Sequence, residues 1–173
     1  MREEIRRLSE LVSEFLDFAR PKPLEKKVHA IRELCERAVQ LVTPSARAGG
    51  IAIGLDLPES EIELEADGAK LEQLLLNLLQ NAVEATAPTG GGSVILRVRR
   101  QARRVAVEVE DDGPGLPSPD APIFDAFFST KPQGTGLGLA IAHRIVTDHG
   151  GDIDVTSRPG RTIFRIALPI RLG

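Results

Sequence analysis

The chain has no tryptophan, no tyrosine and only six phenylalanines among its 173 residues, so its core must be built from aliphatic side chains. A single cysteine, Cys35, excludes an internal disulfide and fits a reducing compartment. No apolar run approaches the roughly 20 residues that a membrane-spanning helix needs, and we expect no signal peptide. We therefore expect a cytoplasmic location, which is compatible with a longer parent anchored in a membrane.

The chain also lacks an excess of basic residues. Its net charge of −3 disfavours nucleic-acid binding, so we expect no nucleic-acid partner. The one basic run, residues 97–104, is interpreted as two solvated strand edges around a hairpin turn, with a phosphate-binding patch as the alternative. A hydrophobic fraction of 42% is ordinary for a soluble protein, and the length suits one domain plus an appendage.

The appendage is predicted to be an amphipathic helix over residues 2–19. Its apolar residues recur every three or four positions, namely at Ile5, Leu8, Val12, Phe15 and Ala19. Such a helix has little of its own to pack on, which favours a partner helix in a bundle; the alternative is that it docks on its own domain. Pro21 and Pro23 end the helix and form a short, stiff joint.

The remaining elements alternate between helix and strand periodicity. Helices are predicted at 29–43, 68–86 with Asp67 as N-cap, and 135–148, and strands at 24–28, 51–57, 61–65, 93–100, 104–111, 152–157 and 162–168. Residues 112–134 lack periodicity, which is typical of a lid or binding loop. This order predicts an α+β two-layer sandwich, a mixed sheet covered by helices on one face.

Two glycine clusters flank the aperiodic segment. The first, Asp111–Gly115, follows a predicted strand, and the second, Gly134–Gly138, precedes a predicted helix. A carboxylate at the end of a strand can accept from the exocyclic amine of adenine. Backbone N–H groups of a glycine-rich segment that opens a helix can bind phosphates. Together the clusters predict an ATP site.

Two asparagines, Asn77 and Asn81, lie four residues apart and therefore on one face of the leucine-rich helix 68–86. An amide oxygen is a neutral, hard ligand that suits Mg²⁺, with phosphates and waters as the other ligands. We favour Asn81 as a magnesium ligand. The alternative is that both side chains face solvent or bond to the backbone.

Four ordered motifs resemble those of the sensor histidine kinases. Residues 77–82 resemble the N box, 111–115 the G1 box, 124–128 the F box and 134–141 the G2 box. The resemblance implies the Bergerat ATP-binding fold, which DNA gyrase and the heat-shock chaperone ATPases share. The segment 127–131 is similar to the lid of the nitrogen-regulation branch.

The resemblance also implies roles for individual residues. Asp111 would read adenine, with Gly113 and Gly115 beneath the base, and Asn81 would hold Mg²⁺ beside Asn77. The G2 residues would close over the phosphates, namely Gly134, Thr135, Gly136, Leu137 and Gly138. Phe124, Phe127 and Phe128 would seat the lid against the core; plain core packing is the alternative reading of these three.

Two departures from the family pattern concern charge and the closing strand. Many members carry Lys or Arg three residues after the metal asparagine, whereas this chain has Glu84, as in the nitrogen-regulation branch. We hypothesise that Lys131 on the lid supplies the missing positive charge to the nucleotide. In the closing strand, Arg161 replaces a glycine before Thr162, which is assigned to the adenine side.

The phospho-acceptor of the family is a histidine followed by an acidic residue. None of His29, His143 and His149 has that context, and we expect structural or solvated roles for them. The chain is therefore interpreted as a fragment: residues 1–20 the tail of the dimerisation and phospho-acceptor hairpin, 21–27 a linker and 28–173 the catalytic domain. The implied partners are that histidine-bearing hairpin, a response-regulator receiver domain and a second copy of the parent protein.

The implied activity is transfer of the ATP γ-phosphoryl group to a histidine. In the gyrase branch a glutamate stands where this chain has Asn77, and an amide has no useful basicity, so water attack is disfavoured. Asn77 and Lys131 are the catalytic candidates. Two alternatives stay open: a kinase of the same fold that phosphorylates a protein serine, and a nucleotide-dependent docking module without catalysis.

Overall fold

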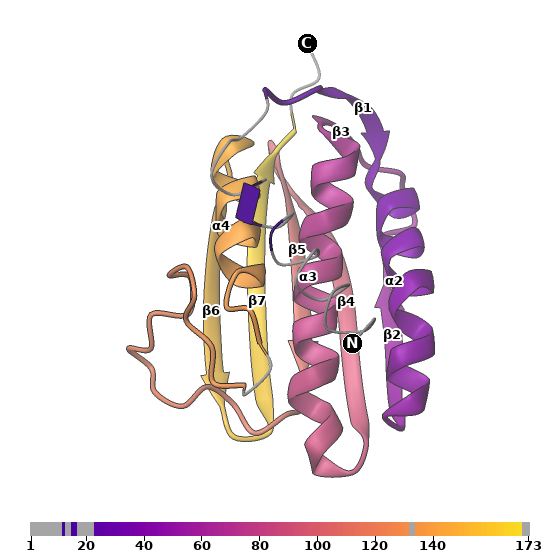
Figure 1. Ribbon diagram of the computed structural model, residues 1–173. Helices are drawn as coiled ribbons and strands as arrows, with labels where there is room; N and C mark the ends of the chain where they lie inside the picture. Colours follow the sequence, from indigo (N-terminus) through magenta and orange to yellow (C-terminus); the bar gives the residue numbers. More distant parts are fainter. Residues whose placement is uncertain (1–11, 13–14, 17–22, 132–133, 171–173) are drawn as a thin grey trace.

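The computed structural model describes residues 12, 15–16, 23–131 and 134–170 of the chain (Figure 1). Its elements are, in order, β1 (Lys27–Ala30), α2 (Ile31–Ala48), β2 (Ile51–Asp56), β3 (Glu63–Ala66), α3 (Gly68–Thr86), the short 3-10 helix η1 (Ala87–Thr89), β4 (Gly92–Gln101), β5 (Arg104–Asp111), α4 (Gly138–Asp148), β6 (Asp152–Arg158) and β7 (Arg161–Pro169). Among the described helices, none is long and apolar enough to cross a membrane.

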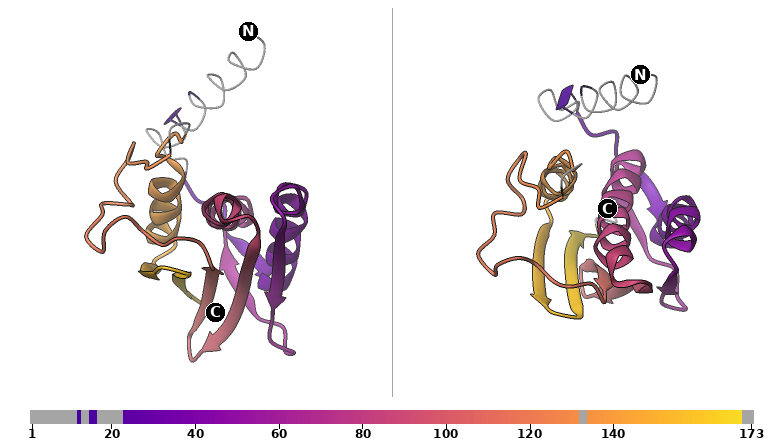
Figure 2. Two further views of the ribbon diagram at one scale, coloured as in Figure 1. Left: turned by 90° about the horizontal axis from the view of Figure 1, so that it is seen from below. Right: turned by 60° about the horizontal axis from the view of Figure 1, so that its bottom comes forward.

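A five-stranded mixed sheet forms one layer of the molecule. Its strand order is β2-β4-β5-β7-β6, in which β2 pairs with β4 in parallel and the other pairs are antiparallel. Strands β1 and β3 form a separate antiparallel pair. Helices α2, α3 and α4 lie in a row over one face of the large sheet (Figure 2, left). The predicted α+β two-layer sandwich is confirmed.

The core between the two layers is aliphatic, as the composition predicted. Alternate residues of β4 and β5 point toward the helices and are at most 1% exposed, namely Val94, Leu96, Val98, Val105, Val107 and Val109. Helix α3 faces them with a stripe of leucines. Cys35 of α2 is completely buried, and burial raises the pKa of its thiol to about 12. Cys35 is therefore packing material rather than a reactive group.

The opposite face of the sheet carries paired charges. Arg97 forms an ion pair with Glu110 and a second with Asp56, and Arg99 also pairs with Asp56. These arginines alternate with the buried valines of β4, so they project from the uncovered face. Part of the basic run 97–104 is thus neutralised by carboxylates on neighbouring strands.

The first predicted strand and helix were misplaced. The strand predicted at 24–28 lies at Lys27–Ala30, so His29 belongs to β1 and not to the start of a helix. The reason is long-range pairing with β3, in which His29 lies opposite Leu64. Local propensity does not report such a pairing.

Helix α2 also extends five residues beyond its predicted end at residue 43. Pro44 lies inside the helix, where the missing N–H leaves a carbonyl without its usual partner. The hydroxyls of Thr43 and Ser45 donate to backbone carbonyls one turn earlier, and Ala46 is buried on the core face. Burial beyond the proline therefore outweighs its cost.

Helix α3 has the predicted bounds, and Asp67 is its N-cap, accepting from the N–H of Lys70 at 3.1 Å. Most of the predicted helix 2–19 and the joint at Pro21 lie outside the described residues. Val12, Phe15 and Leu16 are described, and they are helical and exposed. The division into hairpin tail, linker and catalytic domain stays a prediction.

His149 at the end of α4 ties two helices together. Its Nε2 accepts the N–H of Asp67 at 3.0 Å, so its Nδ1 carries the proton and donates to the carbonyl of Ile145 at 2.7 Å. Burial lowers the pKa of His149 below its ordinary value, since the site suits the neutral ring. The structural role expected for this histidine is confirmed.

We predict that His149→Ala lowers the free energy of unfolding by about 1–3 kcal/mol at pH 7, because it leaves the N–H of Asp67 without a partner. Because the folded-state pKa of His149 is depressed, its contribution is complete above the unfolded pKa near 6.5 and is lost as pH falls. Urea unfolding from pH 5 to 8 measures both effects, with Thr147→Ala on the exposed side of α4 as control. A loss that is equal at pH 5 and pH 8 would contradict this account.

Candidate functional site

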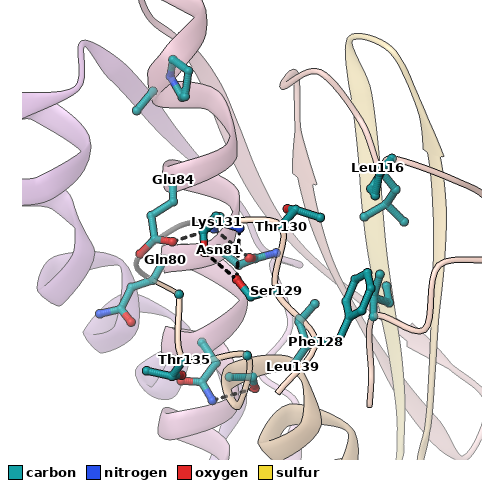
Figure 3. A pocket seen from close by; sticks show the side chains of 18 residues that line it. Gln80, Asn81, Glu84, Leu116, Phe128, Ser129, Thr130, Lys131, Thr135 and Leu139 are labelled. Carbon is teal, nitrogen blue, oxygen red and sulfur yellow. Dashed lines mark hydrogen bonds and ion pairs between the residues drawn. The ribbon is translucent and has the colours of Figure 1, made fainter. Parts of the chain in front are cut away.

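A cavity of about 680 Å³ opens between α3, the first turn of α4 and the described residues 112–131 and 134–137 between β5 and α4, here called the lid (Figure 3). This volume is in the range of small-molecule sites. The described residues that line it are Asn77, Gln80, Asn81, Glu84, Ala87, Pro88, Leu116, Pro117, Ile123, Phe128, Ser129, Thr130, Lys131, Gly134, Thr135, Gly136, Gly138 and Leu139.

The base of the lid is closed by a backbone contact. The N–H of Phe127 donates to the carbonyl of Gly136 at 2.9 Å. Both residues have positive φ, +68° for Phe127 and +69° for Gly136. A glycine adopts this conformation freely, whereas a phenylalanine is strained there. Because Gly136 is not helical, α4 begins at Gly138 and not at the predicted residue 135.

We predict that Gly136→Ala disrupts the lid, because an added Cβ would lie 2.4 Å from the carbonyl carbon of Phe127. Gly54→Ala, on β2 outside the cavity, is the control, since its Cβ would make only an ordinary contact at 3.5 Å with Ile95. Titration with ADP followed calorimetrically is expected to show at least a ~10-fold weaker Kd for Gly136→Ala, from a strain of about 1–3 kcal/mol. Equal affinities of the two variants would show that the close approach is unimportant.

The amides of the two asparagines have different partners. Asn77 donates from Nδ2 to the carbonyl of Gly138 at 3.0 Å and so connects α3 to the first turn of α4. Asn81 accepts at Oδ1 from the ammonium of Lys131 at 3.1 Å. The same ammonium forms an ion pair with Glu84 at 2.6 Å, and Figure 3 shows the three side chains converging.

A side chain within the glycine-rich segment that precedes α4 holds the backbone of that segment in place. Thr135 Oγ1 accepts from the N–H of Leu137 at 3.2 Å. The side chain of Leu137 is fully buried, so only its backbone is available to a ligand. At Gly134 a Cβ would lie 2.3 Å from Ser129 Oγ, which in turn accepts from the N–H of Lys131.

Asp111 lies at the end of β5 with 3% of its surface exposed. Burial is the main cause that raises the pKa of its carboxyl to about 6. The N–H of Gly113, which donates to Oδ1 at 3.0 Å, opposes that rise, while the negative charges of Asp112 and Glu110 add to it. The ammonium of Lys131 lowers the pKa of Asp111, which links the two ends of the site.

The neighbours of Asp111 form a second, compact part of the site. Thr162 lies directly opposite Asp111 in the β5–β7 pairing and is buried. A Cβ at Gly113 would lie 2.8 Å from Asp111 Oδ1, and one at Gly115, where φ is +90°, would approach the backbone of Arg158 at 3.1 Å. Both positions therefore require glycine.

Only some of the predicted site residues line the cavity. Asp111, Gly113, Gly115, Leu137 and Thr162 are not among the described residues that line it. Those at the end of β5 and on β7 form the separate polar group just described.

Sequence reasoning missed several residues of the site, among them Ser157, Gln80, Ser129 and Thr130. Ser157 Oγ accepts from the N–H of Leu116 at 2.9 Å and lies 3.0 Å from Thr162 Oγ1, a bridge that no sequence motif signals. Gln80 and Ser129 line the cavity beside residues that were named. Their positions next to Asn81 and within the lid segment were the only signals available.

The three lid phenylalanines do not act alike. Phe124 packs on the core, with its ring 5.3 Å from that of His143 and 6.4 Å from that of Phe164. Phe128 lines the cavity. Phe127 is 61% exposed, and its ring lies 6.2 Å from that of Phe15. The expectation that all three seat the lid against the core is therefore wrong for Phe127.

Comparison with known proteins identifies the family. Residues 66–172 match the model of the histidine kinase-, DNA gyrase B-, and HSP90-like ATPase family. The sensor histidine kinase ZraS of Klebsiella oxytoca is 38% identical over 172 residues, which are 98% of this chain and 37% of that protein. The chain thus spans well under half of this relative.

Solved structures agree with this result. Full-length ShkA in complex with AMPPNP superposes with a TM-score of 0.89 at 33% identity, covering 99% of this chain and 38% of that one. The histidine kinase ThkA, in complex with the response regulator TrrA, gives a TM-score of 0.82 at 29% identity, covering 98% of this chain and 49% of that one. The chain therefore belongs to the histidine kinase-, DNA gyrase B- and HSP90-like ATPase family, and its domain is of the sensor histidine kinase type.

Proposed function

We propose that this chain binds ATP with Mg²⁺ and transfers the γ-phosphoryl group to a histidine on a helical hairpin of its parent protein. One observation carries the proposal: a hard amide oxygen on Asn81, an ammonium on Lys131 and the glycine segment at the start of α4 meet in a single cavity. These are the groups that neutralise and orient a polyphosphate.

Asp111 is proposed to bind adenine. Its carboxylate would accept from the exocyclic amine, and the opposed Thr162 hydroxyl offers a second polar contact. Gly113 and Gly115 would let the base lie close to the backbone beside Asp111, because any side chain there would collide with Asp111 or with Arg158. A buried acceptor that discriminates the amine of adenine gives specificity for this base.

Asn81 is proposed to hold Mg²⁺, which would supply charge neutralisation on the phosphates when bound. The donors fit, since the amide oxygen of Asn81 and the carboxylate of Glu84 already surround one cation, the Lys131 ammonium. Gly134, Thr135, Gly136 and the backbones of Leu137 and Gly138 would face the phosphates. The ammonium of Lys131 would add a positive charge close to the phosphates.

The acceptor chemistry requires little from this chain beyond positioning. A neutral imidazole nitrogen attacks the γ-phosphorus, the bond to the β–γ bridging oxygen breaks, and ADP leaves with the electron pair. Asn77 cannot act as a base toward water, and its amide is engaged by Gly138. Its proposed role is to hold the glycine segment in register with α3.

One proposed partner is supported by a solved structure of a relative. ThkA is in complex with a response regulator in a structure that covers 98% of this chain, which supports a receiver domain as the eventual phosphoryl acceptor. A histidine-bearing hairpin and a homodimeric parent belong to the same proposal.

The test is phosphoryl transfer from γ-labelled ATP to the parent's acceptor hairpin, added as a separate polypeptide. We expect label on the hairpin that is lost in acid and stable in base, as for phosphohistidine. Acid-stable label would favour a serine kinase of the same fold. Nucleotide binding without any label on the hairpin would favour a docking module and contradict the proposal.

A further inference from the structure

The side chain of Lys131 ties the described part of the lid to α3 by a hydrogen bond and an ion pair. Lys131 Nζ lies 3.1 Å from Asn81 Oδ1 and 2.6 Å from Glu84 Oε2. Asn81 and Glu84 are three residues apart on α3, so their oxygens emerge side by side from one helix face. Two hard oxygens therefore converge on one cation, and the chain itself supplies that cation.

The position of this ammonium conflicts with the metal role of Asn81. The amide oxygen that we assign to Mg²⁺ accepts a hydrogen bond from Lys131, and a cation cannot be added there while the ammonium stays. We propose that Lys131 is a built-in cation that occupies the Asn81–Glu84 oxygens in the nucleotide-free chain and leaves them for the phosphates when magnesium and nucleotide bind. This inference rests on the proposed function of the site.

The lid is built so that the side chain can move while its base stays in place. The Phe127–Gly136 backbone contact closes the base, and Ser129 Oγ accepts from the Lys131 N–H at 3.1 Å. The four-carbon stem of Lys131 carries its ammonium from the lid to α3, and its side chain is 34% exposed. A flexible stem that carries a point charge can exchange partners without rebuilding the loop.

The negative charge of Glu84 makes this exchange important for nucleotide binding. Its carboxylate is 61% exposed and lies beside the oxygen assigned to the metal, so without a cation it repels incoming phosphates. In the free chain Lys131 cancels this charge. Without Lys131, a nucleotide would need Mg²⁺ more strongly; without the charge of Glu84, Lys131 would be free to neutralise phosphates by itself.

The magnesium dependence of binding therefore tests the inference. Calorimetric titration with ADP, in excess Mg²⁺ and in EDTA, gives the ratio of the Kd without metal to the Kd with metal. Lys131→Ala is expected to raise this ratio about 3- to 5-fold and Glu84→Gln to lower it by a similar factor, as suits a partly exposed ion pair. Glu59→Gln, an exposed charge change outside the cavity, is expected to leave it unchanged.

A nucleotide-free measurement separates this inference from the proposed function. Hydrogen exchange of the lid amides between Phe127 and Gly136 is expected to be about 2- to 5-fold faster in Glu84→Gln than in the wild type, because the fastening is weakened. The inference would be overturned if the lid amides exchanged at equal rates in Glu84→Gln and the wild type. It would also be overturned if the chain bound ADP but the ratio of the Kd without metal to the Kd with metal were the same in all variants. A wild-type chain that does not bind ADP at all would instead overturn the proposed function.

Discussion

Asp111→Asn is expected to make the folded chain more stable at neutral pH and at the same time to weaken ADP binding by about 10- to 150-fold. The loss follows from replacing a charged acceptor for the adenine amine, an interaction of roughly 1.5–3 kcal/mol. The gain in folding stability arises because burial of the charged carboxylate is unfavourable, which is also why burial raises the pKa of Asp111 to about 6. An asparagine oxygen can still accept from the N–H of Gly113, so the fold need not change.

The sign of the stability effect depends on pH. Below about pH 3.5 the Asp111 carboxyl is mostly protonated in both states, and the variant and the wild type should be nearly equally stable. Between pH 4 and 6 the unfolded wild type ionises while the folded one resists, so the wild type loses up to about 3 kcal/mol relative to Asp111→Asn. Denaturant unfolding at pH 3.5, 5 and 7.5 measures this difference. A variant that is less stable than the wild type at pH 7.5 would contradict the burial argument.

The same group sets the pH dependence of binding. Because the charged carboxylate is the stronger acceptor for the adenine amine, protonation of Asp111 below pH 6 should weaken ADP binding progressively, up to the roughly 10- to 150-fold loss expected for Asp111→Asn. In Asp111→Asn this dependence should be absent. Calorimetry at pH 5 and pH 7 distinguishes the two cases.

Asn81→Ala is expected to reduce phosphoryl transfer to the acceptor hairpin by roughly 100-fold or more. The reason is that charge neutralisation at the transferred group is the main catalytic contribution in such reactions. ADP binding in EDTA should change by no more than a few-fold, because without metal Asn81 only holds Lys131. The measurement is the initial rate of hairpin labelling, together with the ratio of the Kd for ADP in EDTA to the Kd for ADP in excess Mg²⁺.

Asn77→Ala is the matched comparison, four residues earlier on the same helix. Its bond to Gly138 positions the glycine segment, so this variant should bind ADP more weakly with and without Mg²⁺. If both asparagine variants lost metal dependence alone, Asn77 would have to be a ligand rather than a positioning residue. If Asn81→Ala kept wild-type labelling rates, its assignment to the metal would be wrong.

Elements whose determinants are local could be predicted from the sequence. Helix α3 has its predicted bounds because Asp67 caps it and its leucines repeat with helical period. Strand β1 and the start of α4 could not be placed, since β1 depends on pairing with β3 and the lid base depends on the Phe127–Gly136 contact. These contacts join residues whose proximity no local pattern reports.

In the candidate site, too, residues within local motifs could be predicted, whereas contacts between distant residues could not. The glycine clusters, Asn81 and Asp111 are motif residues, and the sequence places each on its element. The sequence analysis directed the charge of Lys131 to the nucleotide and did not predict the ion pair with Glu84 that the structure shows. The Ser157 bridge to Thr162 and Leu116 had no signal, because the β6–β7 hairpin must fold against a loop residue 41 positions away in the chain to form it.

The most direct test of the nucleotide site is calorimetric titration of the wild-type chain with a non-hydrolysable ATP analogue in the presence of Mg²⁺, and then with ADP. We predict saturable 1:1 binding of both in the micromolar range, stronger with Mg²⁺ than in EDTA and about 10- to 150-fold weaker in Asp111→Asn. Absence of binding by the wild type, or equal binding by Asp111→Asn, would contradict the assignment of this cavity and of Asp111 to ATP.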